Sequence, residues 1–306
     1  MLNFMNSIPV FPQFLPLCLE MEQELHPLLK NSCQGISEFS FPSLLIHQEK
    51  YQYEISNFNN RYYILKGNQH NASFFSILGA IPSKKEIQAI FDYFGANYFW
   101  KNMDKAQYES LASFLETQGF SILEDRNNED YLYERQTLAE LKGKALHKKK
   151  THVNNFEKNY QFSVKPLTKD RVSQAKAILQ QWETDYQSED STDYAICLKA
   201  LDLIEKDYFC GFILYAENIP CAFALGEIIN NNTTFCVHFE KALIEYKGVY
   251  QKMNQVTAEC LDVSIRYINR EQDLGLEGLR KAKLSYKPLC FIQKFAVTLP
   301  KQIETE

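Results

Sequence analysis

The pattern that most constrains the fold is the succession of apolar periodicities in the second half of the chain. Apolar residues at 249, 253, 256, 260 and 263 step alternately by four and three, which predicts a long amphipathic helix. Short apolar runs typical of strands precede and follow it, at 208–214, 220–228, 234–241, 267–268 and 289–297. A strand at 162–164 and helices at 172–182, 194–204 and 277–284 complete the pattern.

The predicted order of elements in this half is strand, helix, helix, three strands, helix, strand, helix, strand. That order is the one used by the GNAT acyltransferase fold. The first half reads as a rougher version of it, with strand-like runs between 39 and 80 that include Ser43–Ile46, two helical patterns and a strand at 130–135. We therefore expect an α/β protein with mixed sheets, built from two tandem GNAT-like domains. The expected parts are an N-terminal helical extension at 1–34, one domain at 35–160 and a second at 161–306.

Composition excludes several classes of protein. The chain is 45% hydrophobic and 23% charged, which is ordinary globular usage and argues against disorder. No run reaches the roughly 18 apolar residues of a membrane-spanning helix. The apolar N-terminus is broken by prolines and lacks the basic start of a signal peptide. The eight cysteines form no CxxC pair, so we expect free thiols in the cytoplasm and no metal site.

Charge is distributed unevenly. The net charge is −5, yet residues 131–170 carry nine Lys and Arg against four Asp and Glu. Residues 265–294 carry seven against three. Two basic segments on an acidic protein predict a localised site for an anion.

The first basic segment, residues 142–159, is expected to be helical. It carries Lys144, Lys148, Lys149 and Lys150, which we predict to bind a phosphate-bearing substrate. Lys144 and Lys148 fall on one side of the helix with Thr151. Phosphate from a nucleic acid, a lipid headgroup or a nucleotide is one interpretation, and a solvated basic face is the other.

The second basic segment follows the strand at 267–268. Asn269, Arg270 and Gln272 are predicted to bind the donor, and Asp273 to handle a proton. Gly275 and Gly278 then open a cationic helix, and a glycine before a helix start favours anion binding there. Charge pairing of Glu277 along the helix is the alternative, but it leaves the preceding polar residues unexplained.

A third stretch runs from a strand into the long helix. His238 and Glu240 are two residues apart, so they should share one face of the strand, and either could act as a general base. Glu245 to Tyr250 stand where GNAT enzymes bind the CoA pyrophosphate, and Gly248 is the one glycine of that signature present here. An acidic residue opposes pyrophosphate, so acetyl-CoA is a less favoured donor.

Three stretches together resemble the DUF2156 family, which is grouped with the C-terminal catalytic domain of phosphatidylglycerol lysyltransferase. They are Asp130–Tyr133 with Leu141–Lys149, then His238-x-Glu240-Lys241-Ala242, and the long motif from Asn269 to Pro288 that includes Tyr286. The resemblance covers about residues 35–298. It implies a tandem GNAT fold related to the Fem peptidyl-bridge transferases.

In the lysyltransferases this domain moves an aminoacyl group from a charged tRNA to a phosphatidylglycerol hydroxyl. Their Leu-Arg-x-x-Lys element matches Leu279, Arg280 and Lys283, whereas Ser285 stands where a second Lys is usual. The resemblance thus implies an acyltransferase with an aminoacyl-tRNA donor and a lipid headgroup or soluble acceptor. Arg280 and Lys283 would stabilise phosphate and oxyanion charge, and Tyr286 would contact substrate.

Two alternatives stay open. One is a noncatalytic tandem GNAT module that binds RNA or another polyanion through the same basic segments, and the other is an acyl-CoA-dependent N-acyltransferase. Peripheral contact with a membrane is compatible with a lipid acceptor. Binder and enzyme both predict affinity for phosphate, but only the enzyme predicts turnover that depends on an acid–base residue.

Overall fold

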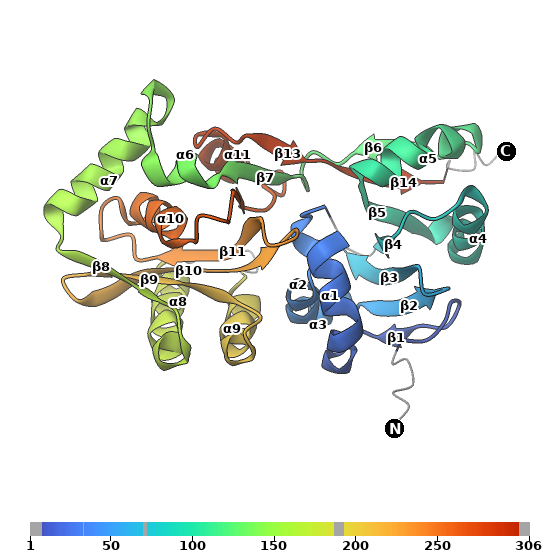
Figure 1. The fold of residues 1–306 in the computed structure, drawn as a ribbon, viewed down its shortest axis with the longest axis horizontal. Helices are drawn as coiled ribbons and strands as arrows, with labels where there is room; N and C mark the ends of the chain where they lie inside the picture. Colours follow the sequence, from blue (N-terminus) through green and yellow to red (C-terminus); the bar gives the residue numbers. More distant parts are fainter. Residues whose placement is uncertain (1–7, 33, 70–71, 187–192, 300–306) are drawn as a thin grey trace. The chain divides into compact units, whose positions relative to one another are not determined.

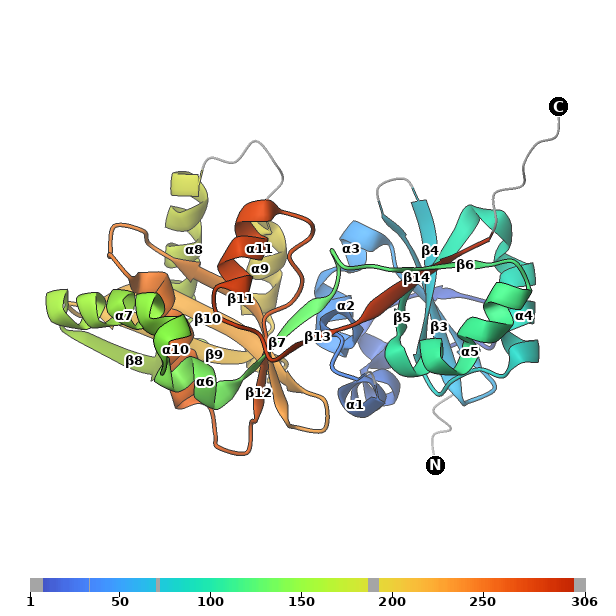
Figure 2. The same ribbon diagram turned by 90° about the horizontal axis from the view of Figure 1, so that it is seen from above.

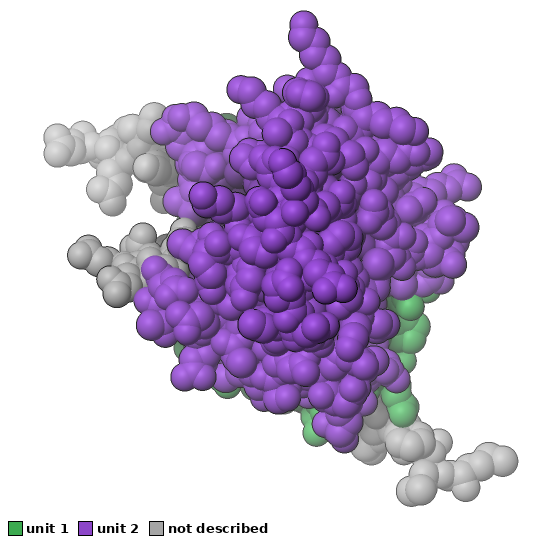
Figure 3. Space-filling model, turned by 90° about the vertical axis from the view of Figure 1, so that its left-hand side faces the viewer, with its two compact units in different colours: residues 1–129, 292–306 green, residues 130–291 purple. Residues whose placement is uncertain are grey.

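A computed structural model describes residues 8–32, 34–69, 72–186 and 193–299. Contacts divide the chain into two compact units (Figure 3). Unit 1 comprises residues 1–129 and 292–306, and unit 2 comprises residues 130–291. Within the described ranges, no helix is both long and apolar enough to cross a membrane.

Unit 1 contains a seven-stranded sheet in the order β1-β2-β3-β4-β5-β14-β6. The strands are β1 (Leu15–Pro16), β2 (Glu54–Phe58), β3 (Tyr62–Gln69), β4 (Ala72–Gly79), β5 (Tyr98–Asp104), β6 (Ser121–Glu124) and β14 (Lys294–Thr298). The helices are α1 (Glu22–Ser32), α2 (Phe41–Ile46), α3 (Gln48–Tyr51), α4 (Lys84–Phe94) and α5 (Lys105–Thr117). Helices α1 to α3 lie on one side of this sheet and α4 and α5 on the other (Figure 2).

Unit 2 contains a second seven-stranded sheet, in the order β13-β7-β12-β11-β10-β9-β8. The strands are β7 (Asp130–Glu134), β8 (Phe162–Pro166), β9 (Cys210–Ala216), β10 (Ile219–Ile229), β11 (Thr234–Ala242), β12 (Tyr267–Asn269) and β13 (Cys290–Ile292). The helices are α6 (Arg135–Glu140), α7 (His147–Asn159), α8 (Val172–Tyr186), α9 (Tyr194–Asp202), α10 (Val249–Cys260) and α11 (Glu277–Leu284). Figure 1 shows α7 and α10 on one side of the sheet and α8 and α9 on the other.

The two sheets follow the same plan. In each, antiparallel strands lead to one parallel pair joined through a helix, β4 with β5 through α4 and β11 with β12 through α10. The next strand in each sheet comes from a distant part of the sequence. In unit 1 it is β14, which pairs antiparallel with β5 and β6. In unit 2 it is β7, which pairs antiparallel with β12.

Local signals explain the helix starts of unit 1. Ser83 and Glu86 form a capping box at α4, and Asp104 and Gln107 form another at α5. Their apolar faces then bury a largely aromatic core. It includes Phe75, Phe91, Phe94, Trp100 and Phe295.

The structure corrects several expected boundaries. Ser43–Ile46 is helical, because Ser40 caps the first turn and Pro42 occupies its start. The run at 289–297 is two strands, of which only β13 stays in the sheet of unit 2. Residues from the expected extension at 1–34 belong to unit 1, since Leu25 and Leu29 of α1 are buried in it.

The division between the units also differs from the expected boundary at residue 160. It falls at residue 130, because β7 pairs with β12 and the basic helix α7 packs against α10. In the second half of the chain, the order of elements agrees with the sequence prediction from β8 to α11, and the two similar sheets agree with the predicted tandem plan.

Candidate functional site

A bulge in β11 separates the two candidate bases. Leu225 of β10 pairs with Phe239 and Gly226 pairs with Val237, so His238 is an extra residue in its strand. Only glycine fits opposite the bulge, because a Cβ at position 226 would lie 2.0 Å from the backbone oxygen of Cys236.

Because of the bulge, His238 and Glu240 point to opposite faces of the sheet. Val237 belongs to the apolar cluster that includes Ala258 of α10, whereas His238 lies outside that cluster and contacts Glu227, which is opposite Cys236. Glu240 is opposite Ala224, which belongs to the apolar cluster that includes Met253 of α10, and Glu240 contacts Asn254 of the same helix. The prediction that His238 and Glu240 share a face is therefore wrong, since it assumed an unbroken two-residue alternation.

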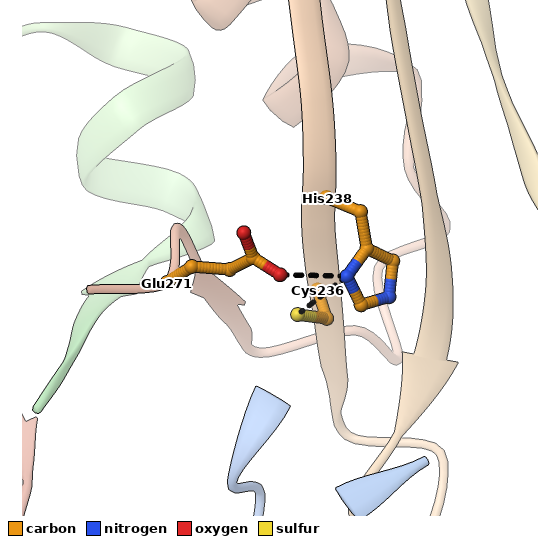
Figure 4. A group of neighbouring side chains, drawn as sticks. All are labelled: Cys236, His238 and Glu271. Atoms are coloured by element: carbon orange, nitrogen blue, oxygen red, sulfur yellow. Dashed lines mark hydrogen bonds and ion pairs between the residues drawn. The ribbon is translucent and has the colours of Figure 1, made fainter. Parts of the chain in front are cut away.

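His238 is the centre of a buried polar group, called here the His238 cluster, formed with Glu227, Cys236 and Glu271. Its Nδ1 lies 2.7 Å from Glu271 Oε1 and 3.9 Å from Cys236 Sγ (Figure 4). Its Nε2 lies 2.9 Å from Glu227 Oε1. Burial alone would lower the pKa of His238, but these three neighbours hold that pKa well above its usual range. A histidine with a carboxylate on each ring nitrogen is a poor general base.

On the α10 face, five elements bring together a second group, called here the Tyr286 cluster. It comprises Glu240 of β11, Asn254 of α10, Arg270 after β12, Tyr286 after α11 and Lys149 of α7. Arg270 donates to Glu240 Oε1 at 3.2 Å, and its guanidinium carbon lies 5.2 Å from the centre of the Tyr286 ring. Lys149 Nζ lies 4.3 Å from the centre of the same ring. The two basic segments of the sequence therefore meet at Tyr286.

The Tyr286 cluster has unused hydrogen-bonding capacity. Glu240 Oε2 and Asn254 Oδ1 are buried and have no hydrogen-bond partner among the described residues. Burial raises the pKa of Glu240, although the charge of Arg270 and a hydrogen bond from the Asn254 side chain lower it. Burial and the charge of Arg270 both lower the pKa of Lys149. Glu240 is therefore a buried carboxylate with a raised pKa, and two cations lie in the same cluster. Such a group is suited to accept and return a proton next to an anionic substrate.

Asp273 and Arg280 form a closed pair. Asp273 is fully buried and receives two hydrogen bonds of 2.8 Å from Arg280, one of 2.6 Å from the Tyr131 hydroxyl and one of 2.9 Å from the backbone of Gly275. Burial alone would raise the pKa of Asp273, but these donors hold it far below its usual range. The geometry suits a structural anchor for the loop before α11 rather than a proton acceptor.

Lys283 binds the same loop from the other end. Its ammonium donates to the backbone oxygens of Arg270 at 2.6 Å, Glu271 at 3.2 Å and Gln272 at 2.5 Å. Burial lowers the pKa of Lys283 to about 8. Three carbonyl acceptors saturate the ammonium, so Lys283 holds the loop that carries Arg270 rather than presenting its charge to a substrate.

The remaining predicted binding residues divide into one that is buried in hydrogen bonds and several that reach the surface. Asn269 is fully buried and links Asp130 Oδ2, at 3.1 Å, to the backbone N–H of Glu271, at 2.7 Å. Gln272 is half-buried. In the basic helix region, Lys144 and Lys148 are exposed and Lys150 is half-buried, so these lysines are accessible at the surface beside Lys149.

Gly248 has a packing role. It precedes α10 with φ of +89°, and a Cβ there would lie 2.4 Å from the backbone oxygen of His152 in α7. Helix α7 thus covers the start of α10, where a GNAT enzyme would bind pyrophosphate. A hollow near this turn is lined by Gln181, Thr184, Asp185, Ile244 and Glu245, and two carboxylates do not favour phosphate.

Sequence reasoning missed Glu227, Cys236, Asn254 and Glu271. A charged residue in the apolar run at 220–228 was a usable signal for Glu227, since a charge in a buried strand needs a partner. Cys236 and His238, two residues apart on one strand, were a usable signal for a shared site. The position of Glu271 depends on the loop after β12 and had no signal of its own.

Comparison with known proteins connects this geometry to a family. The family model described as phosphatidylglycerol lysyltransferase, C-terminal, matches residues 30–298. An uncharacterized protein of Mycoplasmoides gallisepticum is 27% identical over 245 residues, which are 76% of this chain and 73% of that protein. A conserved protein of unknown function from Bacteroides thetaiotaomicron has a similar structure, with a TM-score of 0.84 and 28% identity over 94% of this chain and 99% of that chain.

More distant structures show the fold alone. The C-terminal DUF2156 domain of a protein assigned as a lysylphosphatidylglycerol synthetase, from Agrobacterium fabrum, has a TM-score of 0.61 at 11% identity, over 90% of this chain and 89% of that chain. FemX has a TM-score of 0.62 at 8% identity, over 95% and 98%. A tandem GNAT protein of the clavulanic acid pathway has a TM-score of 0.52 at 7% identity, over 94% and 98%. The predicted tandem GNAT fold and the DUF2156 resemblance are confirmed.

Proposed function

Because this chain belongs to the phosphatidylglycerol lysyltransferase C-terminal family, we propose that its unit 2 transfers an aminoacyl group from aminoacyl-tRNA to a hydroxyl or amine acceptor. The observation that carries the proposal is the Tyr286 cluster. Lys149 and Arg270 flank one aromatic ring beside Glu240, whose Oε2 has no partner among the described residues. Aminoacyl-tRNA is made in the cytoplasm, so the proposal places unit 2 there.

The proposed reaction needs one proton acceptor and one site for negative charge. The acceptor oxygen or nitrogen attacks the acyl carbon of the ester and gives its proton to Glu240. The carbonyl oxygen becomes an oxyanion, which Arg270 and Lys149 stabilise. The ester bond to the terminal ribose of the tRNA then breaks, and the ribose oxygen takes the proton from Glu240. This assigns to Arg270 and Lys149 the charge-stabilising role that sequence reasoning gave to Arg280 and Lys283.

Substrate binding rests on the accessible lysines. Lys144, Lys148 and Lys150 extend the positive charge of Lys149 along the α7 region. Phosphates of the donor would displace counterions there. A lipid headgroup and a soluble amine or alcohol are the two acceptor classes to compare. The covered start of α10 argues against the acyl-CoA alternative.

The test is a transfer assay with labelled aminoacyl-tRNA and either phosphatidylglycerol vesicles or soluble acceptors. Glu240→Gln should lower turnover by about 10²- to 10⁴-fold, the usual contribution of general acid–base catalysis, and leave tRNA affinity unchanged. Asp193→Asn is the matched control. This half-exposed carboxylate pairs with Lys241, which is next to Glu240 on β11. If wild type binds tRNA but transfers nothing to any acceptor, the noncatalytic RNA-binding alternative holds. If Glu240→Gln keeps full turnover, Glu240 is not the proton acceptor.

A further inference from the structure

The His238 cluster has the arrangement of a metal site, and this inference does not depend on the proposed function. Cys236 Sγ, His238 Nδ1 and one carboxylate oxygen of Glu271 all lie within 4.8 Å of one another (Figure 4). The three side chains converge from β11 and from the loop after β12, where Asn269 is the parallel partner of Cys236. Cys236 and His238 are two residues apart on β11, so the thiol and the imidazole lie on the same face of the sheet.

The distances fit one small cation with minor adjustment. Around a tetrahedral zinc ion, bonds of about 2.3 Å to sulfur and about 2.0 Å to nitrogen place those two atoms roughly 3.5 Å apart. The observed Sγ–Nδ1 separation is 3.9 Å. The Nδ1–Oε1 separation of 2.7 Å is that of a hydrogen bond, and it would have to widen as the metal takes the place of the shared proton. The thiol proton would likewise pass to solvent.

A second observation points to a metal ligand. His238 Nε2 lies 2.9 Å from Glu227 Oε1, and Glu227 is buried and opposite Cys236 in the sheet. A histidine that binds a metal usually donates its other ring N–H to a carboxylate, which fixes the tautomer and orients the ring. Glu227 would do this, and Nδ1 would then present its lone pair to the metal.

The donor set identifies the class of ion. A thiolate, an imidazole and a carboxylate suit zinc, whereas magnesium and calcium prefer oxygen ligands. Three protein ligands leave a fourth tetrahedral position for water or a substrate atom. Cys236 and His238 are buried, but the side chain of Glu271 is 27% exposed, so an ion can enter from that side.

We propose that Cys236, His238 and Glu271 bind one zinc ion, with Glu227 as the partner of His238. The ion would join β11, which carries Glu240, to the loop that carries Arg270. Asn269 and Lys283 already hold the backbone of Glu271, so the site is largely preformed. The expectation from cysteine spacing that no metal binds is replaced by this proposal.

The test is metal binding by the full chain, stripped with a chelator and titrated with zinc against a chromophoric competitor. Wild type should bind one equivalent. Cys236→Ser and His238→Gln should abolish stoichiometric binding, and Glu227→Gln should weaken it by about 10- to 100-fold, as is typical for residues that orient a metal ligand. Cys221→Ser is the matched control, because Cys221 is a buried thiol on the adjacent strand β10, and it should bind like wild type.

A second measurement covers variants that fail to fold. Cobalt added to the stripped wild-type chain should give the visible absorption of a tetrahedral site and a thiolate charge-transfer band. Cys260→Ser, which removes an exposed thiol, should leave that spectrum unchanged. The proposal is overturned if wild type binds less than one equivalent of zinc, if the cobalt complex lacks the thiolate band, or if Cys236→Ser binds as Cys221→Ser does.

Discussion

Both units place a parallel strand pair beside a strand taken from far along the chain, yet their equivalent hairpins differ. In unit 1, β3 and β4 pair in continuous register from Tyr62–Gly79 to Gln69–Ala72. In unit 2, the register of β10 and β11 breaks at Leu225/Gly226. The continuous pair supports an aromatic core, whereas the bulged pair turns one polar residue to each face.

The buried charges of the two units differ in the same sense. In unit 1 the carboxylate of Glu38 binds Lys294 with one oxygen and Asn102 with the other. In unit 2 the carboxylate of Glu240 binds Arg270 and leaves Oε2 without a partner among the described residues. A satisfied carboxylate stabilises a fold, and one with unused capacity can take a proton. For these two carboxylates, the comparison assigns a structural role to Glu38 and a chemical role to Glu240.

The strongest way to break the comparison is to remove the bulge. Gly226→Ala should destabilise unit 2 by about 3 kcal/mol, because the added Cβ meets the backbone oxygen of Cys236 and overpacking of this kind is costly. Turnover should be lost with it, since Glu240 and His238 depend on the bulge for their faces. Gly67→Ala in β3 is the matched control, where the nearest atoms lie at 2.9 Å, and should cost about 1 kcal/mol. Equal losses in chemical denaturation of the two variants would remove the special role of the bulge.

Removing the arginine from an ion pair should show whether that arginine stabilises the fold or acts in the reaction. Arg280→Ala leaves the buried carboxylate of Asp273 without its main donor, so it should lower the free energy of unfolding by more than the loss of an exposed ion pair does. Arg61→Ala breaks the exposed pair with Glu86 in unit 1, and should cost less than about 1 kcal/mol. Denaturation midpoints measure both. Unchanged stability of Arg280→Ala with a large loss of turnover would instead return Arg280 to the reacting centre.

The accessible lysines allow a comparison of surfaces. Replacing Lys148, Lys149 and Lys150 with Ala should weaken tRNA binding about 10-fold at physiological salt. The slope of log affinity against log salt concentration should become shallower by about 2, because fewer counterions are released. The matched control replaces three exposed lysines of unit 1, Lys84, Lys85 and Lys105, with Ala. It should change neither the affinity for tRNA nor the salt slope. Filter binding at several salt concentrations measures the slopes. Equal slopes for the two triple variants would show that the basic helix is a solvated face.

The smallest expected effect is a pH dependence in unit 1. Burial lowers the pKa of Lys101 to about 8, so between pH 8 and 10.5 the unfolded chain holds a proton that the folded chain has lost. Stability from this group therefore rises with pH, by about 1 kcal/mol between pH 8 and 9. Lys101→Met should lack that rise, which the difference between the two denaturation curves isolates from other titrating groups. A variant with the wild-type pH profile would contradict the low pKa.

The sequence alone was sufficient for the order of elements in the second half of the chain, the tandem plan and the family. Those features follow from local periodicity and from motif residues that are close in sequence, such as the run from Asn269 to Pro288. The meeting of the two basic segments was suggested by charge, but its location at Tyr286 was not. Lys149 and Tyr286 meet only because α7 packs on α10 and because Lys283 of α11 is hydrogen-bonded to the loop after β12.

The tertiary structure alone decided two features. One is that β14 joins the sheet of unit 1, and the other is that His238 and Glu240 lie on opposite faces of the sheet. Whether a strand after α11 stays in its own unit depends on pairing with partners more than a hundred residues away, as for β14 with β6. Whether His238 and Glu240 share a face depends on a single unpaired residue, which adds no signal to the alternation read along the strand. A two-residue period predicts faces only while the register holds, and the register changes at Gly226, where only glycine leaves room for the close approach of the neighbouring strand.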